Sequence, residues 1–321
     1  MAGFTLERRA LFGGLLVAAG LAVVPKAIIA QAPLQLADVN RMDQAAFVKA
    51  FGDVYEFSPW VAEAAYQKRP FKTVTSLHAA LADAFTAAPR EKRLDFLKRL
   101  SDLGDKSARP ATVTAASRGE QKSSGINSLN ETDQALLEAL NKAYRQKFDM
   151  AFVIAVRRNT PAEIFAEYMR RMSNSPAEEL ALATEQEFLI TRLRIAEMVS
   201  GEGMPKVYGD LTAHVLDATI GKPAAGVAVE LREMWGDRWR KVAAAVTNGD
   251  GRASLIEAQP VPIGRYELWF GVGGYFRQRA AVPATEQPFL DRVPLRTFVS
   301  KPEDSYHFPL ITTPFGYTIH G

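Results

Sequence analysis

The hydrophobic residues of this chain repeat with two different periods, one in each half. Between about residues 34 and 200 they recur at i, i+3 or i+4 and i+7, which is the spacing of an amphipathic helix. The clearest helical runs lie at 42–56, 75–88, 90–103, 130–148 and 176–199. Asn130 and Ser175, which precede two of these runs, are typical helix-capping residues. This half is therefore predicted to be an all-α helical bundle.

Two segments interrupt or end the helical pattern. Residues 107–128 are rich in Ser, Ala and Gly, so we expect a long loop there with about one turn of helix. Loops of this length inside a compact domain often carry function. Residues 201–210 contain three glycines and Pro205, which is typical of a linker. The helical domain is accordingly expected to span residues 34–200.

Beyond the linker, apolar and polar residues alternate with a period of two, which favours β-strands. Short strand-like runs are separated by Gly-rich turns over about 110 residues, a density typical of a β-sandwich. The expected strands are 211–217, 226–234, 238–247, 253–258, 265–272, 275–282, 294–299 and 306–312. The fold class predicted from the two patterns is α + β in separate domains, with the β domain at 211–321.

Composition removes several classes of function. The 321 residues include 39 Lys and Arg against 36 Asp and Glu, and no basic stripe is interleaved with aromatic residues. Nucleic-acid binding therefore has little support. The absence of cysteine excludes disulfides, thiolate metal sites and a cysteine nucleophile. Only four histidines are present, so we expect no metal site.

The first 32 residues have the order of an export signal. Arg8 and Arg9 precede an apolar run from Leu11 to Val24, and small residues follow near Ala30. The run is too short for an ordinary membrane-spanning helix, which needs about 20 residues. The arginine pair resembles a twin-arginine signal, so we expect a periplasmic protein cleaved after Ala30. An uncleaved anchor is the alternative interpretation.

Four sequence blocks in the β half, taken together, resemble the 5-hydroxyisourate hydrolases related to transthyretin. They lie in order at 211–231, 247–255, 264–276 and 306–318, and reach the C-terminus. The resemblance implies a transthyretin-like sandwich that assembles as a homotetramer, with active sites between subunits. It also implies hydrolysis of a small cyclic amide, 5-hydroxyisourate, an unstable product of urate oxidation, without a cofactor.

The same resemblance implies three catalytic residues. These are His214 in the L-T-x-H-V-L-D motif, Arg252 in T-N-x-D-G-R, and His307 before the apolar end of the last block. Histidine can take a proton from water and return one to the leaving nitrogen, because it titrates near neutral pH. A guanidinium can hold the oxyanion that forms when water attacks the carbonyl.

The C-terminal segment departs from the family pattern. The family ends in Y-R-G-S, whereas this chain has Ile319 and His320 at the Tyr-Arg position and lacks the terminal Ser. Tyr317, Thr318 and His320 are candidate substrate contacts. His320 either supplies a polar group in place of the arginine or is a loose end, and the sequence leaves both interpretations open.

The helical half resembles the decarboxylases of 2-oxo-4-hydroxy-4-carboxy-5-ureidoimidazoline (OHCU), which act next on the route from urate to allantoin. The resemblance rests on blocks at 47–71, 101–106, 119–130, 140–157 and 179–198. It covers about residues 38–200, and the two activities also occur fused in other proteins of this pathway. We therefore interpret the chain as a fusion of the two families.

The family's catalytic histidine heads an H-P-D-L motif, whose first position is Leu100 here. Other family positions are kept: Ser117, Glu120, Gln121 and Arg194. Leucine cannot donate or accept a proton, whereas general acid–base catalysis raises reaction rates by roughly 10²–10⁴-fold. The sequence therefore predicts a hydrolase with an inactive, decarboxylase-like helical domain. A bifunctional enzyme that forms (S)-allantoin is one alternative, and a non-catalytic transthyretin-like carrier or scaffold is another.

Overall fold

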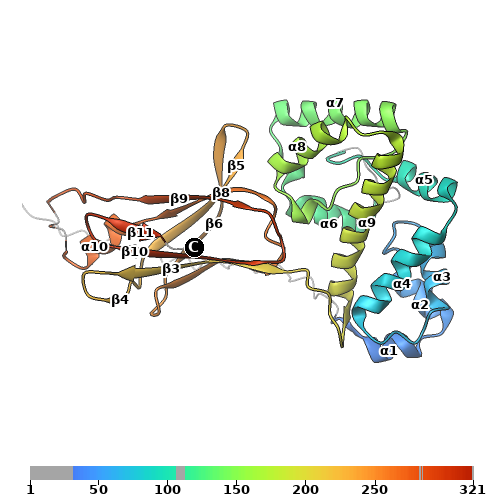
Figure 1. Ribbon diagram of the computed structural model, residues 1–321, viewed down its shortest axis with the longest axis horizontal. Helices are drawn as coiled ribbons and strands as arrows, with labels where there is room; N and C mark the ends of the chain where they lie inside the picture. Colours follow the sequence, from blue (N-terminus) through green and yellow to red (C-terminus); the bar gives the residue numbers. More distant parts are fainter. Residues whose placement is uncertain (1–31, 106–112, 282, 284, 320–321) are drawn as a thin grey trace, which may run out of the picture. The chain divides into compact units, whose positions relative to one another are not determined.

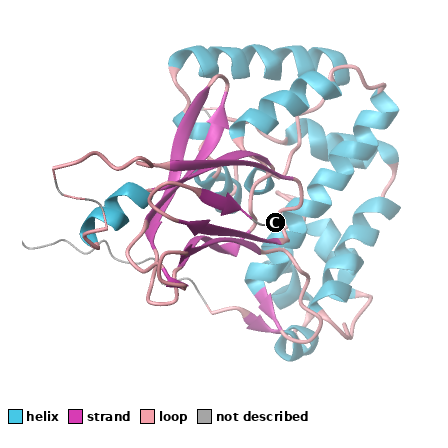
Figure 2. Ribbon diagram, turned by 60° about the vertical axis from the view of Figure 1, so that its left-hand side comes forward, coloured by secondary structure: helices cyan, strands magenta, loops and turns pink. Residues whose placement is uncertain are grey.

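The computed structural model describes residues 32–105, 113–281, 283 and 285–319. The expected export signal, Val282 at the end of one expected strand, and His320 lie outside these residues. Figure 1 shows the helices of the first half and the strands of the second, and Figure 2 colours them cyan and magenta. The predicted fold class, with helices and strands in separate domains, is confirmed.

The helical domain begins and ends with two-residue strands that pair in parallel, an addition to the predicted bundle. These are β1 (Leu34–Gln35) and β2 (Val199–Ser200). Its helices are α1 (Leu36–Arg41), α2 (Gln44–Phe51), α3 (Pro59–Tyr66), α4 (Val74–Ala87), α5 (Arg90–Arg99), α6 (Ala115–Ser123), α7 (Glu131–Phe148), α8 (Pro161–Arg171) and α9 (Pro176–Met198). Two 3₁₀ turns lie at η1 (Ile126–Ser128) and η2 (Val156–Arg158).

Short polar side chains begin several of these helices, as the sequence indicates. Asn130 accepts a hydrogen bond from the Asp133 amide at the start of α7. Ser175 forms a reciprocal capping box with Glu178 at the start of α9. The amide groups of a first helical turn have no partner within the helix, so these caps satisfy donors that would otherwise be unpaired. The predicted starts of both helices are confirmed.

The segment expected to be a loop with one turn of helix contains more helix than that. Helix α6 has nine residues, and Thr114 caps it by accepting from the Ser117 amide. The 3₁₀ turn η1 follows after Gly125, which has φ of 80°. Serines and Gly119 give α6 a weak intrinsic helix propensity. We infer that packing of α6 against the rest of the domain stabilises the helix despite this weak propensity.

The β domain is a sandwich of two sheets with its own hydrophobic core. One sheet has the order β11-β10-β3-β4, with β7 also paired to β3, and the other has the order β6-β5-β8-β9. The strands are β3 (Gly209–Asp217), β4 (Lys222–Pro223), β5 (Ala228–Trp235), β6 (Arg238–Val246), β7 (Arg252–Gln259), β8 (Gly264–Phe270), β9 (Val293–Val299), β10 (Ser305–Thr312) and β11 (Tyr317–Ile319).

One expected strand is wrong. Residues 272–278 form a short helix, α10 (Val272–Gln278), where the alternation at 275–282 favours a strand. Val272, Tyr275 and Phe276 are all buried, and their i, i+3, i+4 spacing fits a helical face. Gly273 and Gly274 weaken the helix signal, since glycine is a poor helix former. Packing of the two aromatic rings onto the sandwich therefore decides the local structure.

Candidate active sites

The two histidines and the arginine predicted for the β domain come from three strands of one sheet. His214 lies in β3 and stands directly opposite Arg252, the first residue of antiparallel β7. His307 lies in β10, which runs parallel to β3 on its other side and pairs His307 with Thr212. The imidazole ring centres of His214 and His307 are 6.0 Å apart. Strand pairing therefore brings together residues that are far apart in the sequence.

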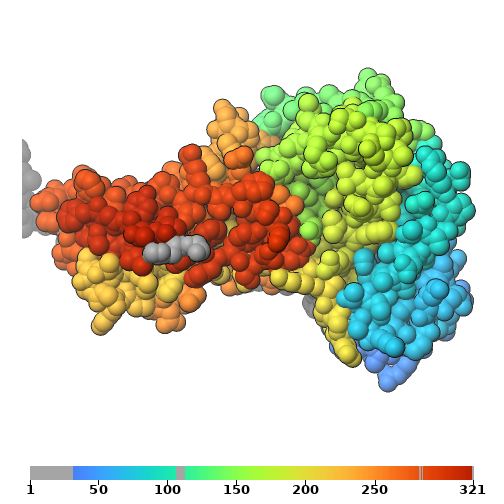
Figure 3. All heavy atoms as spheres, viewed as in Figure 1, coloured from blue at the N-terminus to red at the C-terminus, as the bar shows by residue number. Residues whose placement is uncertain are grey.

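All three side chains project from the outward face of this sheet. Successive residues of a strand point to opposite faces, and Leu211, Ala213 and Val215 of β3 are fully buried in the core. His214 therefore points away from the core, and its paired neighbours point the same way. His307 and Arg252 are exposed. In Figure 3 the atoms of the last strands, coloured red, lie at the surface.

His307 is held in a defined orientation and is kept uncharged. Its Nδ1 lies 2.9 Å from Thr212 Oγ1 and forms a hydrogen bond with it. Partial burial, followed by the positive charge of Arg252 and the influence of His214, lowers the pKa of His307, while Asp210 opposes the shift. A neutral imidazole at neutral pH can accept a proton, which is the role of a general base.

The C-terminal strand β11 borders this face. Thr318 pairs with Ile311 of β10, and Tyr317 pairs with the buried Thr312. Because β10 alternates, Thr318 shares the outward face with His307, whereas Tyr317 lies in register with the opposite face. Of the three predicted substrate contacts, Thr318 thus lies on the same face of the sheet as His214 and His307.

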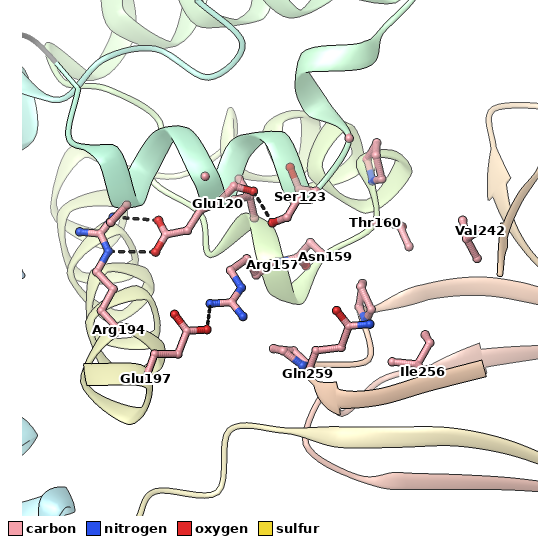
Figure 4. Close-up of a pocket in the computed structure, with 18 of the residues that line it drawn as sticks. Glu120, Ser123, Arg157, Asn159, Thr160, Arg194, Glu197, Val242, Ile256 and Gln259 are labelled. Atoms are coloured by element: carbon pink, nitrogen blue, oxygen red, sulfur yellow. Dashed lines mark hydrogen bonds and ion pairs between the residues drawn. The ribbon is translucent and has the colours of Figure 1, made fainter. Parts of the chain in front are cut away.

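The helical domain contains a second group of polar residues, which is buried. Arg194 of α9 donates to both carboxylate oxygens of Glu120 at 2.9 and 2.8 Å (Figure 4). It also donates to Ser117 Oγ at 2.7 Å and to the Val54 carbonyl at 2.9 Å. The guanidinium is thus bound on several sides, and Glu120 in particular pairs with it in bidentate geometry.

These residues line a cavity of about 60 Å³. Leu100, at the predicted position of the lost histidine, also lines it, as does Gln121. Gln121 Oε1 accepts from the Gly104 amide at 3.1 Å, so this side chain fixes the turn after Leu100. The four predicted remnants and the substituted position therefore lie around one cavity.

Sequence reasoning missed two residues of this cavity, Glu56 and Glu187. Glu56 accepts a hydrogen bond from Ser117, and its pKa is raised mainly by burial. It precedes Phe57, whose φ of 51° lies in the left-handed region that residues other than glycine rarely adopt. Such strain often accompanies functional sites. Glu187 lies seven residues before Arg194 on the buried face of α9, a helical spacing that could have identified it.

Within the described residues, no cluster of histidine or acidic side chains is arranged to bind a metal ion. The remaining described histidine, His78, is half-buried against Thr191, with its Nε2 3.1 Å from the hydroxyl. Burial lowers its pKa to about 4. His78 is therefore a neutral, hydrogen-bonded residue at neutral pH. Among the described residues, no helix is long and apolar enough to cross a bilayer.

Comparison with known proteins assigns a family to each domain. The model of the OHCU decarboxylase family matches residues 40–196, and that of the HIUase/transthyretin family matches residues 211–321. The chain therefore belongs to both families, as a fusion of an OHCU decarboxylase domain and a 5-hydroxyisourate hydrolase/transthyretin domain.

Individual relatives agree with these assignments. The OHCU decarboxylase of Haloferax volcanii is 40% identical over 169 residues, which is 53% of this chain and 98% of the relative. The 5-hydroxyisourate hydrolase of Deinococcus radiodurans is 48% identical over 112 residues, which is 34% of this chain and 92% of the relative. The uric acid degradation bifunctional protein of Bacillus subtilis is 29% identical over 166 residues, 52% of this chain and 33% of that protein.

Proposed function

We propose that the β domain hydrolyses 5-hydroxyisourate. The observation that carries this proposal is the meeting of His214, Arg252 and His307 on the outward face of one sheet. Two imidazoles and a guanidinium are the groups that hydrolysis of a cyclic amide needs. The identity of 48% to a hydrolase of this name supports the same reaction.

The geometry supports a division of roles. His307 is uncharged and takes a proton from water as the oxygen attacks the ring carbonyl. Arg252 stabilises the oxyanion with its guanidinium. As the carbon–nitrogen bond breaks, the ring nitrogen receives a proton through the pair of imidazoles, which are close enough to act on one small substrate. The net change is addition of one water molecule.

The same face of the sheet is where we place subunit contact in a homotetramer. His307, Arg252 and Thr318 are exposed in the single chain. A hydrolytic site must exclude bulk water around its charged groups for them to act strongly. A second copy packed over this face would do so. Sedimentation of the purified chain at several concentrations tests the assembly, and a strictly monomeric active enzyme would contradict it.

We also propose that the protein is exported to the periplasm through its first 32 residues, with the twin-arginine-like pair Arg8 and Arg9 as the signal. Fractionation of cells that produce the full chain, combined with N-terminal sequencing, tests this. A mature N-terminus near Gln31 is expected. Retention of the whole chain in the membrane favours an uncleaved anchor.

The experiment for the hydrolase follows urate oxidation by uricase through ultraviolet absorbance and circular dichroism. Accelerated decay of 5-hydroxyisourate in the presence of the chain is the expected result. An unchanged decay contradicts the hydrolase and favours the non-catalytic carrier or scaffold. The natural decay without protein provides the baseline.

A second candidate function is decarboxylation of OHCU by the helical domain to give (S)-allantoin. The buried pairing of Arg194 with Glu120 at a cavity favours this function. Burial of charged groups costs free energy, and a role in binding the substrate would explain why this pair is kept. Leu100 opposes it, since the imidazole of the family is missing. The same time course distinguishes the two: rapid formation of optically active allantoin supports decarboxylation, and persistence of OHCU supports the inactive domain predicted from Leu100.

A further inference from the structure

A buried carboxyl group in the helical domain has an oxygen without a partner. Glu187 of α9 is only 3% exposed and lines the same cavity as Arg194. Its Oε1 is fully buried and makes no hydrogen bond. Unpaired buried oxygens are rare, because each one forgoes the hydrogen bonds that water would provide. A carboxyl group in this state is more stable with a proton than without one.

The charges around the cavity lead to the same conclusion. Three carboxyl groups, Glu56, Glu120 and Glu187, face one guanidinium, that of Arg194. Arg194 donates its hydrogen bonds to Glu120, to Ser117 and to a backbone carbonyl. Glu187 is therefore left outside the ion pair. Burial, together with the charges of Glu56 and Glu120, raises its pKa to about 8, although Arg194 opposes the shift.

The groups that face Glu187 from other elements do not remove its proton. Tyr55, just before Glu56, is buried with a strongly raised pKa and stays neutral. His78 of α4 reaches Thr191, one turn from Glu187, and is also neutral above about pH 4. Arg194 and Glu120 neutralise each other. At neutral pH, Glu187 is thus a buried acid with a transferable proton in the lining of the cavity.

Part of the lining of the cavity is apolar. Leu100, Val113, Phe152 and Ile190 line it together with Glu187. A carboxylate placed against such apolar side chains is poorly solvated, and loss of CO₂ moves its negative charge into the conjugated ring, where it is spread over several atoms. In this setting Leu100 contributes an apolar surface where the family has an imidazole.

We propose that Glu187 is the general acid of the helical domain and protonates the ring carbon next to the one that loses CO₂. This proposal rests on the second candidate function, decarboxylation of OHCU. The bond between the hydroxyl-bearing ring carbon and the carboxylate breaks, CO₂ leaves, and the electron pair forms a double bond to the adjacent ureido-bearing carbon, whose double bond to the ring nitrogen opens. The Glu187 proton then forms the new carbon–hydrogen bond at the ureido-bearing carbon, while the hydroxyl proton passes to the ring nitrogen and the hydroxyl-bearing carbon becomes a carbonyl. Glu187 is left as a carboxylate and regains a proton from water.

A proton donor in a fixed position also determines the configuration of the product. A proton delivered from Glu187 reaches one face of a planar intermediate, so the allantoin formed is optically active. Protonation from bulk water reaches both faces and gives a racemate. The optical activity of newly formed allantoin therefore reports where the proton came from.

The test compares the whole chain with two variants on the same helix, Glu187→Gln and Glu185→Gln. Glu185 is exposed two residues away and serves as the matched control. Each protein is added to urate and uricase, and circular dichroism follows the allantoin. We expect Glu187→Gln to lower the rate of decarboxylation about 100-fold or more. Glu185→Gln should match the unchanged chain, and all three should hydrolyse 5-hydroxyisourate equally, which confirms that each is folded.

A pH profile separates a proton donor from a merely structural residue. Decarboxylation by the unchanged chain should fall as pH rises through about 8, where Glu187 loses its proton, and the residual rate of Glu187→Gln should not show this fall. If the unchanged chain decarboxylates but Glu187→Gln does so equally well, the role of Glu187 is wrong while decarboxylation stands. If the unchanged chain does not decarboxylate OHCU at all, both are overturned.

Discussion

The two sites use burial in opposite ways. In the β domain, His307 projects from a sheet surface, and partial burial lowers its pKa. In the helical domain, Glu187 is enclosed, and burial raises its pKa to about 8. Burial disfavours the charged form of either group. It therefore increases the fraction of neutral imidazole, which can accept a proton, and the fraction of neutral carboxyl group, which can donate one. In the roles that we propose, the same physical effect prepares one site to accept a proton and the other to donate one.

The sites also differ in how their residues are positioned. Strand pairing fixes His214 against Arg252, and the chain can exchange these side chains at little cost in stability because they lie outside the core. Arg194 is 6% exposed and donates hydrogen bonds to helix α6 and to the connection that follows α2, so it contributes to folding as well as to the site. Substitutions should therefore affect activity in the first site and stability in the second.

Replacement of Arg194 should have the largest effect on stability. Arg194→Gln leaves Glu120 buried without a cation, and loss of one partner of a buried pair costs about 3–5 kcal/mol. Urea unfolding followed by far-ultraviolet circular dichroism measures this cost. Arg192→Gln, a less buried arginine on the same helix, is the control and should change the unfolding free energy by less than about 1 kcal/mol. Equal losses of unfolding free energy in the two variants would contradict a particular contribution of the buried pair to stability.

Replacement of Arg252 should affect activity and leave stability unchanged. Arg252→Gln removes the cation that we propose stabilises the oxyanion, and loss of such a group typically lowers kcat/KM, here for 5-hydroxyisourate, by about 10²–10³-fold. The residue is exposed, so the unfolding free energy should stay within about 0.5 kcal/mol. Arg238→Gln in β6, which is also exposed, provides the control for loss of one positive charge. A matching loss in that variant would indicate a general charge effect.

Glu187 should make stability depend on pH. Its pKa is about 8 in the folded chain against an ordinary value of 4.5, so the folded state binds more protons between these values. Stability is then lost as pH rises, by about 1.4 kcal/mol per unit, or about 2 kcal/mol from pH 6 to 7.5. Glu187→Gln should lack this contribution. The difference in unfolding free energy between the two proteins, measured by urea at each pH, isolates it, and a constant difference would refute a protonated Glu187.

The fold was largely predictable because its two hydrophobic periods are long and regular. The exceptions are short segments in which packing outweighs local preference. Helix α10 contains two glycines and is stabilised by burial of Tyr275 and Phe276, which alternation alone cannot reveal. Helix α6 is polar and capped by Thr114, so its sequence has the composition of a loop.

Only those site residues that lie in recognisable motifs could be predicted from the sequence. His214, Arg252 and His307 lie in recognisable blocks, but their distances depend on a register between strands that no local pattern specifies. Glu187 lies inside the block 179–198, but the resemblance assigns a role there only to Arg194, and the residues around Glu187 are ordinary helix residues. Its burial depends on which face of α9 meets the rest of the bundle. A charged residue on the apolar face of a predicted helix is the signal that would have found it.

The most direct test of the hydrolase site is the decay of 5-hydroxyisourate with the unchanged chain and with His307→Asn. Asparagine keeps a polar side chain of moderate size but cannot act as a base. The site described here predicts that the unchanged chain shortens the lifetime of 5-hydroxyisourate, and that His307→Asn loses about 10²–10⁴-fold in rate. Glu187→Gln should hydrolyse it normally. Full activity of His307→Asn would contradict catalysis at the outward face of this sheet.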